Sequence, residues 1–413
     1  MNKKLKVLVC AFACLGDPDK RFGQGGEGVL GWNLVKQLSR FFDVFVLTHS
    51  GNKEVIEKEK VQNLKFFYLD FPLLNFFQNI PGGIQIYAYL WQIRACVLAY
   101  KLHRKIHFDV FHHLTYANDW MASFIGALLP IPYIRGPCGG AQKVPKNFLS
   151  EFPFKDRLFQ HLRSIGQWVF RHDPFFIISQ KKAKAILVCN KESFAKIPKK
   201  WQKKTYFFPV NGISKEDLDL LSRKKKKSEN KFKVLSAGKL LPIKGFSLAI
   251  KAFKVFSGKV KNAELEIIGD GPELLPLKNL AQQLKIQEKI KFKKWLPRDE
   301  FLKELVDCDV FLFPSLRDGG GQVVIEAMAA SKPVICLDLA GPGFHIKEEW
   351  GVKIKPTFPE RAIKEIAKAL EKLYTNESLR IQLGKRARER VENFYHLDKL
   401  GERLFKIYQE ALD

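Results

Sequence analysis

Short apolar segments alternate with amphipathic helical patterns along most of the chain, and this rhythm constrains the fold more than any other feature. In the first half, strands are predicted at residues 5–10, 43–48, 65–68, 109–113, 131–135 and 185–188, with helices between several of them. Strands that alternate with helices usually run parallel, and a parallel sheet is covered by helices on both faces. The first half therefore predicts a doubly wound α/β domain.

The same rhythm begins again after a charged, wholly polar stretch at residues 222–230, which includes the basic run 223–227. Strands are predicted at 232–237, 263–268, 290–293, 309–312 and 333–337, with helices from Lys244 and near Leu274, and residues 359–412 read as helices only. A chain of 413 residues usually forms more than one core. We expect Rossmann-like domains at 1–221 and 232–385 facing each other across a cleft, a basic linker at 222–231, and a helix at 386–413 that crosses back to brace the first domain.

Cysteine usage and the apolar segments bear on the compartment. The seven cysteines are scattered, and only Cys10 and Cys14 lie close together, so neither a disulfide framework nor a zinc-ribbon spacing is expected. The apolar run at the start continues as the first strand, so we expect no export signal. The longest apolar stretch, 84–100, is interrupted by Gln85, Gln92 and Arg94 and is not expected to span a membrane. These features favour the cytoplasm.

The chain is strongly basic, with 70 Lys and Arg against 43 Asp and Glu and a formal net charge of +27. Such a charge attracts nucleic acids, anionic lipid surfaces and phosphorylated substrates. The alternative is a diffuse charge with no particular partner, because the basic residues are spread along the whole chain. No recognition helix, RNP-like aromatic motif or zinc module accompanies it, so no specific nucleic-acid partner is expected. Residues 66–100 are dense in aromatic and aliphatic side chains, and a buried core is favoured there over a membrane-facing surface.

The stretch 313–329 carries the clearest chemical signal. A predicted strand ends there, three glycines follow, and a helix begins near Gln322, so free backbone N–H groups and the positive helix end form a cradle for an anion. The glycines are Gly319, Gly320 and Gly321. Asp318 and Glu326 flank this cradle, and their carboxylates would accept hydrogen bonds from the hydroxyls of a sugar and a ribose.

A second anion site is predicted at 234–245, where a strand leads through Gly238 and a short loop into a helix. Lys239 and Lys244, five residues apart at the carboxyl end of this strand, suit a diphosphate and would neutralise a departing one. The alternative is that both are solvated surface lysines of a very basic chain.

Together these two segments resemble the donor domain of the family-four retaining glycosyltransferases of the GT-B type, and the resemblance extends over nearly the whole chain. The family's spacing of a carboxylate, seven residues and a glutamate matches Asp318 and Glu326. The segments 211–213, 269–273, 309–315 and 326–335 also occur in family order. Two positions depart from the usual pattern, since Asp318 stands where Glu is common and Lys239 where Arg is common.

The resemblance implies roles for further residues. Gly25 and Gly26, in a glycine-rich loop after the first strand, would approach the donor phosphate or the acceptor. His112 and His113 end a strand of the first domain, and at most one of them is expected to reach the donor sugar, because neighbouring side chains of a strand point to opposite faces. Trp295 and Leu296 lie where the family binds the base. The loop at 136–142 resembles a Gly-Pro-x-Gly-Gly loop of some members, and a simple tight turn is the alternative.

The mechanism implied is metal-independent transfer with retention at the anomeric carbon and without a cofactor. Lys239, Lys244 and the helix start would hold the leaving phosphates, Glu326 would bind the ribose, and Asp318 with one histidine would orient the sugar. The donor would be a UDP or GDP sugar and the acceptor a glycan or lipid-linked glycan, as in cell-surface polysaccharide synthesis. The Asp-x-Asp at 307–309 fits a turn or cap better than a metal site. A catalytically silent nucleotide-sugar binder and a polyanion-binding protein are the alternatives.

Reversible attachment to the anionic cytoplasmic face of a membrane is also expected from the charge. The lipid-facing element would come from residues 71–77 and 84–105, which combine aromatic side chains with Arg94, Lys101, Arg104 and Lys105. The alternative is that the aromatic side chains form core and the charge is diffuse.

Overall fold

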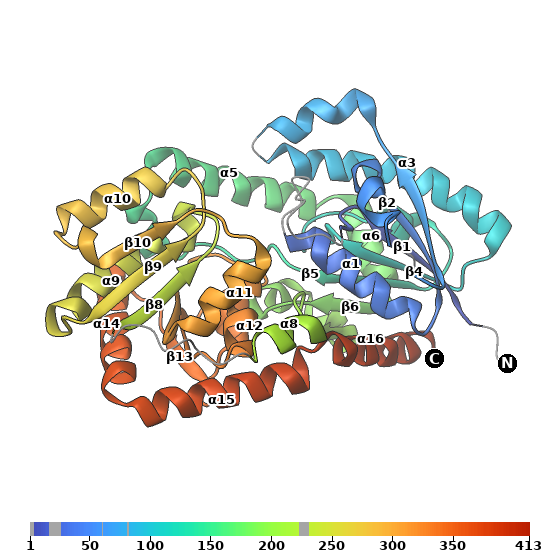
Figure 1. Ribbon diagram of the computed structural model, residues 1–413. Helices are drawn as coiled ribbons and strands as arrows, with labels where there is room; N and C mark the ends of the chain where they lie inside the picture. The colour runs from blue at the N-terminus through green and yellow to red at the C-terminus, as the bar shows by residue number, and fades with distance from the viewer. Residues whose placement is uncertain (1–3, 16–25, 60, 81, 223–230) are drawn as a thin grey trace. The chain divides into compact units, whose positions relative to one another are not determined.

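The computed structural model describes residues 4–15, 26–59, 61–80, 82–222 and 231–413 (Figure 1). The chain divides into two compact units. The N-terminal unit comprises Met1–Ala141, Arg163–Val210 and Leu397–Asp413, and the C-terminal unit comprises Gln142–Leu162 and Asn211–His396. Most of the predicted linker and the lysine run within it lie outside the described residues.

The N-terminal unit is built on a parallel sheet whose order, within the described residues, is β3-β2-β1-β4-β5-β6-β7. Its strands are β1 (Lys6–Ala11), β2 (Asp43–His49), β3 (Leu64–Leu69), β4 (Val110–Thr115), β5 (Tyr133–Cys138), β6 (Ala185–Val188) and β7 (Thr205–Phe207). Its helical segments are α1 (Gly26–Ser39), η1 (Ser50–Asn52), α2 (Lys53–Ile56), η2 (Pro72–Asn79), α3 (Gly83–Ile106), α4 (Phe124–Leu128), α6 (Pro174–Lys182), α7 (Lys191–Lys196), η4 (Lys199–Lys204) and α16 (Leu397–Leu412). The predicted strands are all present, and β7 is an addition.

Helices cover both faces of this sheet because its strands are apolar on both sides. Leu8 and Cys10 of β1 pack in one cluster with Trp91 of α3, whereas Val7 and Val9 pack in the opposite cluster with α1 and α16. The predicted return of the terminal helix to the first domain is thus confirmed, but that helix begins at 397 and not at 386.

A buried histidine ties α16 to the sheet. The Nε2 atom of His112 lies 2.6 Å from the carbonyl oxygen of Gly136, so Nε2 donates and Nδ1 accepts a bond of 2.7 Å from the Tyr408 hydroxyl. Burial lowers the pKa of His112 to about 4, and the ring is therefore neutral at neutral pH.

The C-terminal unit holds a second parallel sheet, in the order β10-β9-β8-β11-β12-β13 within the described residues. Its strands are β8 (Phe232–Ala237), β9 (Ala263–Ile268), β10 (Ile290–Lys293), β11 (Val310–Phe313), β12 (Val334–Leu337) and β13 (Gly351–Ile354). Its helical segments are η3 (Lys146–Glu151), α8 (Lys215–Leu220), η5 (Pro242–Lys244), α9 (Phe246–Lys259), α10 (Leu274–Gln283), η6 (Gln287–Lys289), α11 (Arg298–Asp307), α12 (Gln322–Ala329), α13 (Ala340–His345), α14 (Pro359–Thr375) and α15 (Glu377–Phe394). Helix α5 (Phe154–Arg171) continues across the residue at which the units are divided. Strand β13 is the one addition to the predicted strands in this part of the described chain.

The division differs from the predicted domain boundaries. Residues 142–162 belong to the C-terminal unit because Val144, Phe148 and Phe152 are buried in the core formed around α9. Residues 211–221 also belong to it, since Ile213 and Leu218 pack in its second core cluster. The sequence rhythm could not reveal this, because the apolar pattern of a segment does not say which core buries it.

The aromatic segment at 66–100 is divided between core and surface. Phe71 and Phe77 pack against the core of the N-terminal unit, whereas Leu73 and Phe76 are 83% and 56% exposed. The preference for core was therefore right for only part of the segment. Among the described residues, every helix is too short or too polar to cross a bilayer.

We predict that Tyr408→Phe lowers the free energy of unfolding by about 1–3 kcal/mol, because it leaves the buried Nδ1 of His112 without its donor. Urea denaturation measures this loss. Tyr100→Phe is the matched control, since its hydroxyl bonds to the carbonyl of Leu128 at an exposed position; an equal effect of both changes would contradict the assigned role of Tyr408.

Candidate functional site

The C-terminal sheet reverses its strand order between β8 and β11. From β8 the chain moves outward to β9 and β10, then returns to β11 beside β8 and moves outward on the other side to β12 and β13. The loops after β8 and β11 therefore leave the carboxyl ends of these two strands in opposite directions. Open α/β sheets bind ligands at such a switch point. The two predicted anion-binding segments are the loops that follow these two strands.

The two loops are packed against each other through their backbones. The backbone N–H of Leu316 donates to the carbonyl of Ile243 at 2.9 Å, and the Ser315 hydroxyl donates to the same carbonyl at 3.2 Å. Gly245 has φ of 70°, and a Cβ atom at this position would lie 2.1 Å from the carbonyl oxygen of Pro314. Glycine is therefore required there, and this close packing places Lys244 beside the loop after β11.

Asp318 is held by a cation and by two backbone N–H groups. One carboxylate oxygen accepts from the N–H groups of Gly320 and Gly321 at 3.1 and 2.7 Å, and the other is ion-paired with the ammonium of Lys244. Burial alone would raise the pKa of Asp318, but the ion pair and the N–H donors outweigh burial and lower it. Asp318 is thus a carboxylate at neutral pH.

This arrangement corrects the predicted anion cradle. The N–H groups of Gly320 and Gly321 bind Asp318 and are not available to a ligand in this structure. The next N–H groups, of Gln322 and Val323, lie in the first turn of α12, where an intrahelical acceptor does not exist. An anion would therefore bind about one residue further along the chain than expected.

Lys239 and Gly238 lie on the loop after β8. Lys239 is exposed, whereas Lys244 is ion-paired with Asp318, and the contact of both lysines with a diphosphate stays a prediction. The backbone of Gly238 packs closely against Gly269, since a Cβ atom on Gly269 would lie 1.9 Å from the carbonyl oxygen of Gly238. The backbone N–H of Leu240 also donates to the carbonyl of Asp270 at 2.8 Å. The glycine-rich segment after β9 is thereby joined to the same edge of the sheet.

Glu326 is buried in an ionic cluster that includes a residue the sequence reasoning missed. Its Oε1 atom accepts from Arg298 at 2.8 Å and from Gln322 at 3.0 Å, while Arg298 also pairs with Asp217 at 2.6 Å. Burial disfavours the charge of Arg298, but the two carboxylates outweigh burial and raise its pKa. The sequence did hold a sign of these carboxylates. Arg298 is the first residue of α11, and a cation at a helix N-terminus is unfavourable unless negative charges lie nearby.

Trp295 and Leu296 lie between β10 and α11, next to this cluster in the chain. The Trp295 side chain is 45% exposed, whereas Leu296 packs against the core. An exposed, rigid ring at the end of an edge strand is suited to stacking against a flat ligand.

Two further side chains contact the glycine loop after β11. His345 is buried, with Nε2 donating to the carbonyl of Gly320 at 2.6 Å and Nδ1 accepting from Tyr395 at 2.8 Å, and burial lowers its pKa to about 4. A Cβ atom on Gly319 would lie 2.9 Å from Nε2 of Gln142. His345 gave no sequence signal because its role depends on a contact between distant segments, whereas Gln142 ends the glycine loop singled out at 136–142.

In the N-terminal unit, both predicted histidines are buried. His112 uses its two ring nitrogens to join α16 to the sheet. His113 is 1% exposed, and burial with the nearby charge of Arg135 lowers its pKa to about 3. A contact between a histidine and the donor sugar stays a prediction. Gly26 is the exposed first residue of α1, while Gly25 lies outside the described residues.

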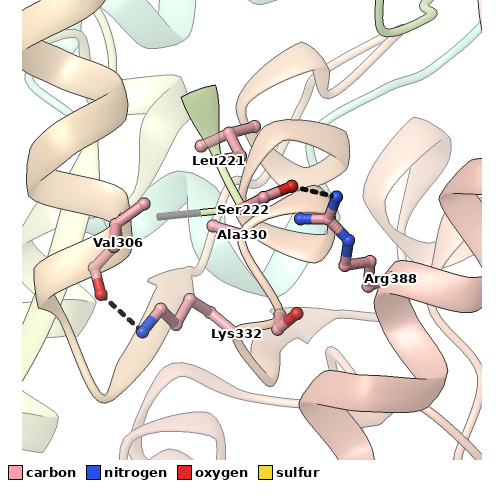
Figure 2. A pocket seen from close by; sticks show the side chains of 7 residues that line it. Leu221, Ser222, Val306, Ala330, Lys332 and Arg388 are labelled. Atoms are coloured by element: carbon pink, nitrogen blue, oxygen red, sulfur yellow. Dashed lines mark hydrogen bonds between the residues drawn. The ribbon is translucent and has the colours of Figure 1, made fainter. Parts of the chain in front are cut away.

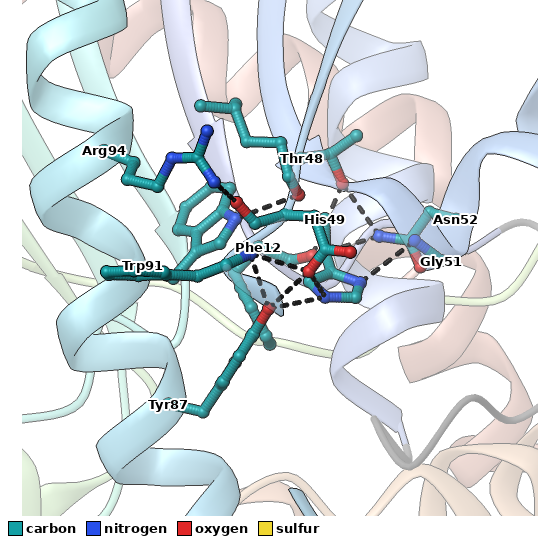
Figure 3. Close-up of polar contacts among 11 residues, drawn as sticks. Phe12, Thr48, His49, Gly51, Asn52, Tyr87, Trp91 and Arg94 are labelled. Atoms are coloured by element: carbon teal, nitrogen blue, oxygen red, sulfur yellow. Dashed lines mark hydrogen bonds and ion pairs between the residues drawn. The ribbon is translucent and has the colours of Figure 1, made fainter. Parts of the chain in front are cut away.

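A polar network at the carboxyl ends of β2 and β3 was not predicted (Figure 3). The hydroxyl of Tyr87 lies 3.1 Å from Nε2 of His49 and donates to the carboxylate of Asp70 at 2.8 Å. Asp70 and Arg94 also line a cavity of about 600 Å³ beside α3. This network is a second candidate for ligand contacts, within the N-terminal unit.

The C-terminal unit has a smaller cavity of about 360 Å³, and the cations that line it bond to the protein itself (Figure 2). Its lysine, Lys332, donates to the carbonyl of Val306 at 2.7 Å, and its arginine, Arg388, donates to the Ser222 hydroxyl at 2.7 Å. These cations stabilise the local backbone.

The Asp-x-Asp segment makes a structural contact between strands, which differs from the predicted turn or cap. Asp309 accepts a bond of 2.9 Å from the backbone N–H of Lys233 and so fixes the start of β11 beside β8. The part of the chain that the structure describes contains no group of three His, Cys, Asp or Glu side chains arranged to hold a metal ion.

We predict that Lys244→Met lowers the free energy of unfolding by about 1–3 kcal/mol at neutral pH, because it leaves the partly buried carboxylate of Asp318 without its cation. Since the folded state lowers the pKa of Asp318, this stabilisation is present above the ordinary carboxyl pKa and is lost as the pH falls through the folded value. Denaturation of both proteins over a range of pH measures the difference.

Two variants control this prediction. The double variant with Asp318→Asn should recover most of the loss, because it removes the stranded charge. Lys239→Met should change stability by less than about 0.5 kcal/mol, as expected of an exposed side chain. A double variant as unstable as Lys244→Met would contradict the coupling.

Comparisons with known proteins agree with this fold. Residues 218–390 match the family of glycosyl transferases group 1. An uncharacterized glycosyltransferase of Haemophilus influenzae is 31% identical over 49% of this chain and 56% of its own length. A capsular polysaccharide biosynthesis glycosyltransferase of Staphylococcus aureus is 30% identical over 50% of this chain and 54% of its own length. The chain thus spans about half the length of these relatives.

Solved structures match nearly the whole chain at low sequence identity. Sucrose-phosphate synthase from Thermosynechococcus elongatus superimposes with a TM-score of 0.70 at 16% identity over 98% of this chain and 99% of that chain. The Anabaena protein HepE in complex with UDP gives 0.63 at 14% identity, with the same coverage. These likenesses confirm the predicted GT-B fold class.

Proposed function

We propose that the chain is a retaining, metal-independent glycosyltransferase whose donor is a nucleotide-diphosphate sugar. One observation carries the proposal: the Lys244–Asp318 ion pair lies at the switch point between β8 and β11, next to the first turn of α12. A cation and a helix N-terminus close together are suited to a diphosphate.

The chemistry follows from this charge arrangement. The bond between the anomeric carbon and the diphosphate breaks, and a bond from the acceptor oxygen forms on the same face, with the acceptor proton passing to the leaving phosphate. Lys244 and the first N–H groups of α12 would stabilise the negative charge that develops on the diphosphate. Asp318 would keep Lys244 in position, and no strong protein base is required.

The nucleoside would bind toward β10 and α12. Both donors to Glu326 reach Oε1, so Oε2 is the atom proposed to accept a ribose hydroxyl. Trp295 would stack on the base. The HepE structure holds UDP, which supports a UDP-type donor for this chain, with GDP as the other nucleotide to test.

The proposed acceptor is a glycan or a lipid-linked glycan. The Staphylococcus aureus relative is named for capsular polysaccharide biosynthesis, which supports cell-surface polysaccharide synthesis as the role of this chain. We also propose reversible attachment to the anionic cytoplasmic face of a membrane, because the net charge of +27 attracts acidic headgroups.

We predict that Lys244→Ala weakens the binding of UDP or GDP at least about tenfold in calorimetry. The binding of UMP or GMP should weaken less, because the cation contributes most to binding the terminal phosphate of the diphosphate. Lys254→Ala, on an exposed face of α9, is the control and should bind like the wild type. Unchanged affinity in Lys244→Ala would refute this site.

Transfer activity should persist when EDTA removes divalent ions, since the proposed charge stabilisation comes from Lys244 and α12. Activity with the matching donor is measured before and after chelation. A complete loss that Mn²⁺ or Mg²⁺ restores would overturn metal independence while leaving the nucleotide site intact.

A further inference from the structure

Helix α5 presents its apolar face outward, which is the reverse of an ordinary surface helix. The exposed large side chains are Phe154, Leu158, Phe159, Leu162, Ile165, Trp168 and Val169. Three of them, Phe154, Ile165 and Trp168, are 73%, 60% and 62% exposed. Most are spaced by three or four residues and so form one stripe along the helix.

The opposite face of α5 faces the protein and is mostly polar, with Phe170 packed against Tyr89 and Trp120. Gln167 is buried, and its side-chain amide donates to the carbonyl of Gly140 at 2.8 Å. Arg163 donates to the same carbonyl at 2.7 Å, and Arg171 is ion-paired with the buried carboxylate of Asp119. These bonds fix the rotation of the helix about its axis, so the apolar stripe has no means of turning inward.

The stripe therefore exposes a contiguous apolar surface to water, and such surfaces mark interaction sites. Helix α3 differs, because it buries Tyr87, Trp91 and Ala95 in the core and leaves only a remainder of its apolar side chains, such as Val97, outside. Of these two helices, α5 is the one whose orientation requires a partner to cover it.

We propose that α5 lies in the plane of a membrane interface, with its apolar stripe among acyl chains and its basic residues at anionic headgroups. Charge complementarity selects this partner, because every exposed Lys, Arg, Asp or Glu side chain between Phe154 and Lys182 is basic. Lys155 and Arg157 are exposed at the start of the helix, and Lys181 and Lys182 are exposed on α6. Trp168 supplies an aromatic side chain of the kind enriched at membrane interfaces.

The inference rests on the proposed membrane attachment and names the element that makes it. Helix α6 extends the surface, since Ile177 and Ile178 are 47% and 40% exposed beside those lysines. The attachment is interfacial, because α5 has too little apolar length to cross a bilayer.

Sedimentation of the full chain with vesicles tests the proposal. Wild type is compared on mixed phosphatidylglycerol and phosphatidylcholine vesicles and on pure phosphatidylcholine vesicles. The α5 variant Leu162→Gln/Ile165→Gln/Trp168→Gln is compared with the α3 variant Ile93→Gln/Val97→Gln/Tyr100→Gln, which removes three partly exposed apolar side chains of similar size. Thermal unfolding should change little in both, because the substituted side chains are largely exposed and only the hydrogen bond of Tyr100 to the Leu128 carbonyl is lost.

Wild type should bind the anionic vesicles and release as salt rises, and the α5 variant should partition about a hundredfold more weakly because three apolar side chains no longer enter the bilayer. The α3 variant should bind within about twofold of wild type, because its substituted side chains lie outside the surface formed by α5 and α6. If the α5 variant binds the anionic vesicles as well as wild type does, the assignment to α5 is wrong, although the attachment itself would stand.

Two other outcomes would also count against the proposal. Failure of wild type to bind anionic vesicles even at low salt would remove both the attachment and its docking helix, whereas UDP binding would be unaffected and would still test the transferase site. A concentration-dependent dimer in sedimentation velocity that the α5 variant loses would assign the stripe to a second copy of the chain instead.

Discussion

The ion pair between Lys244 and Asp318 is the interaction on which the rest of the candidate site depends. It joins the loops that leave β8 and β11, and it forms because Gly245 allows those loops to approach within backbone contact. Asp318 also accepts hydrogen bonds from the N–H groups of Gly320 and Gly321. An anionic ligand would therefore meet a cation already positioned by a carboxylate, and little reorganisation would be needed when charge develops on it.

The glycine loop after β11 is held from several directions within the C-terminal unit. His345 bonds to its carbonyl from the buried side, and Gln142 covers Gly319. Gln142 belongs to the segment 142–162, which the chain inserts from between parts of the N-terminal unit. The core residues of that segment, such as Phe148, thus anchor a loop that the local sequence around 319 could not hold alone. Its backbone is supported by tertiary contacts rather than by its own propensity.

The strand rhythm predicted the fold class because a two-sided parallel sheet imposes a strong apolar pattern, and short strands such as β7 escaped because three residues carry little pattern. The glycine loop and the family resemblance marked Asp318 and Glu326 as candidates, but neither could show that Asp318 accepts from the N–H groups of its own loop. Arg298 and His345 were missed because their partners lie far away in the sequence. The position of His112 and His113 at a strand end predicts only that at most one of them reaches the donor sugar. The bonds of His112 with Tyr408 and Gly136 could not be predicted, because they depend on the docking of a distant helix.

Hydrogen–deuterium exchange of the full chain with and without UDP or GDP tests the central claim most directly. Binding at the switch point should slow exchange at the backbone amides of Gln322 and Val323 and in the loop around Lys244, because a diphosphate would accept from those first-turn N–H groups. The account predicts this protection in the wild type and its loss in Lys244→Ala. Nucleotide-dependent protection that leaves both loops unchanged, and appears instead near His49 and Tyr87, would contradict it.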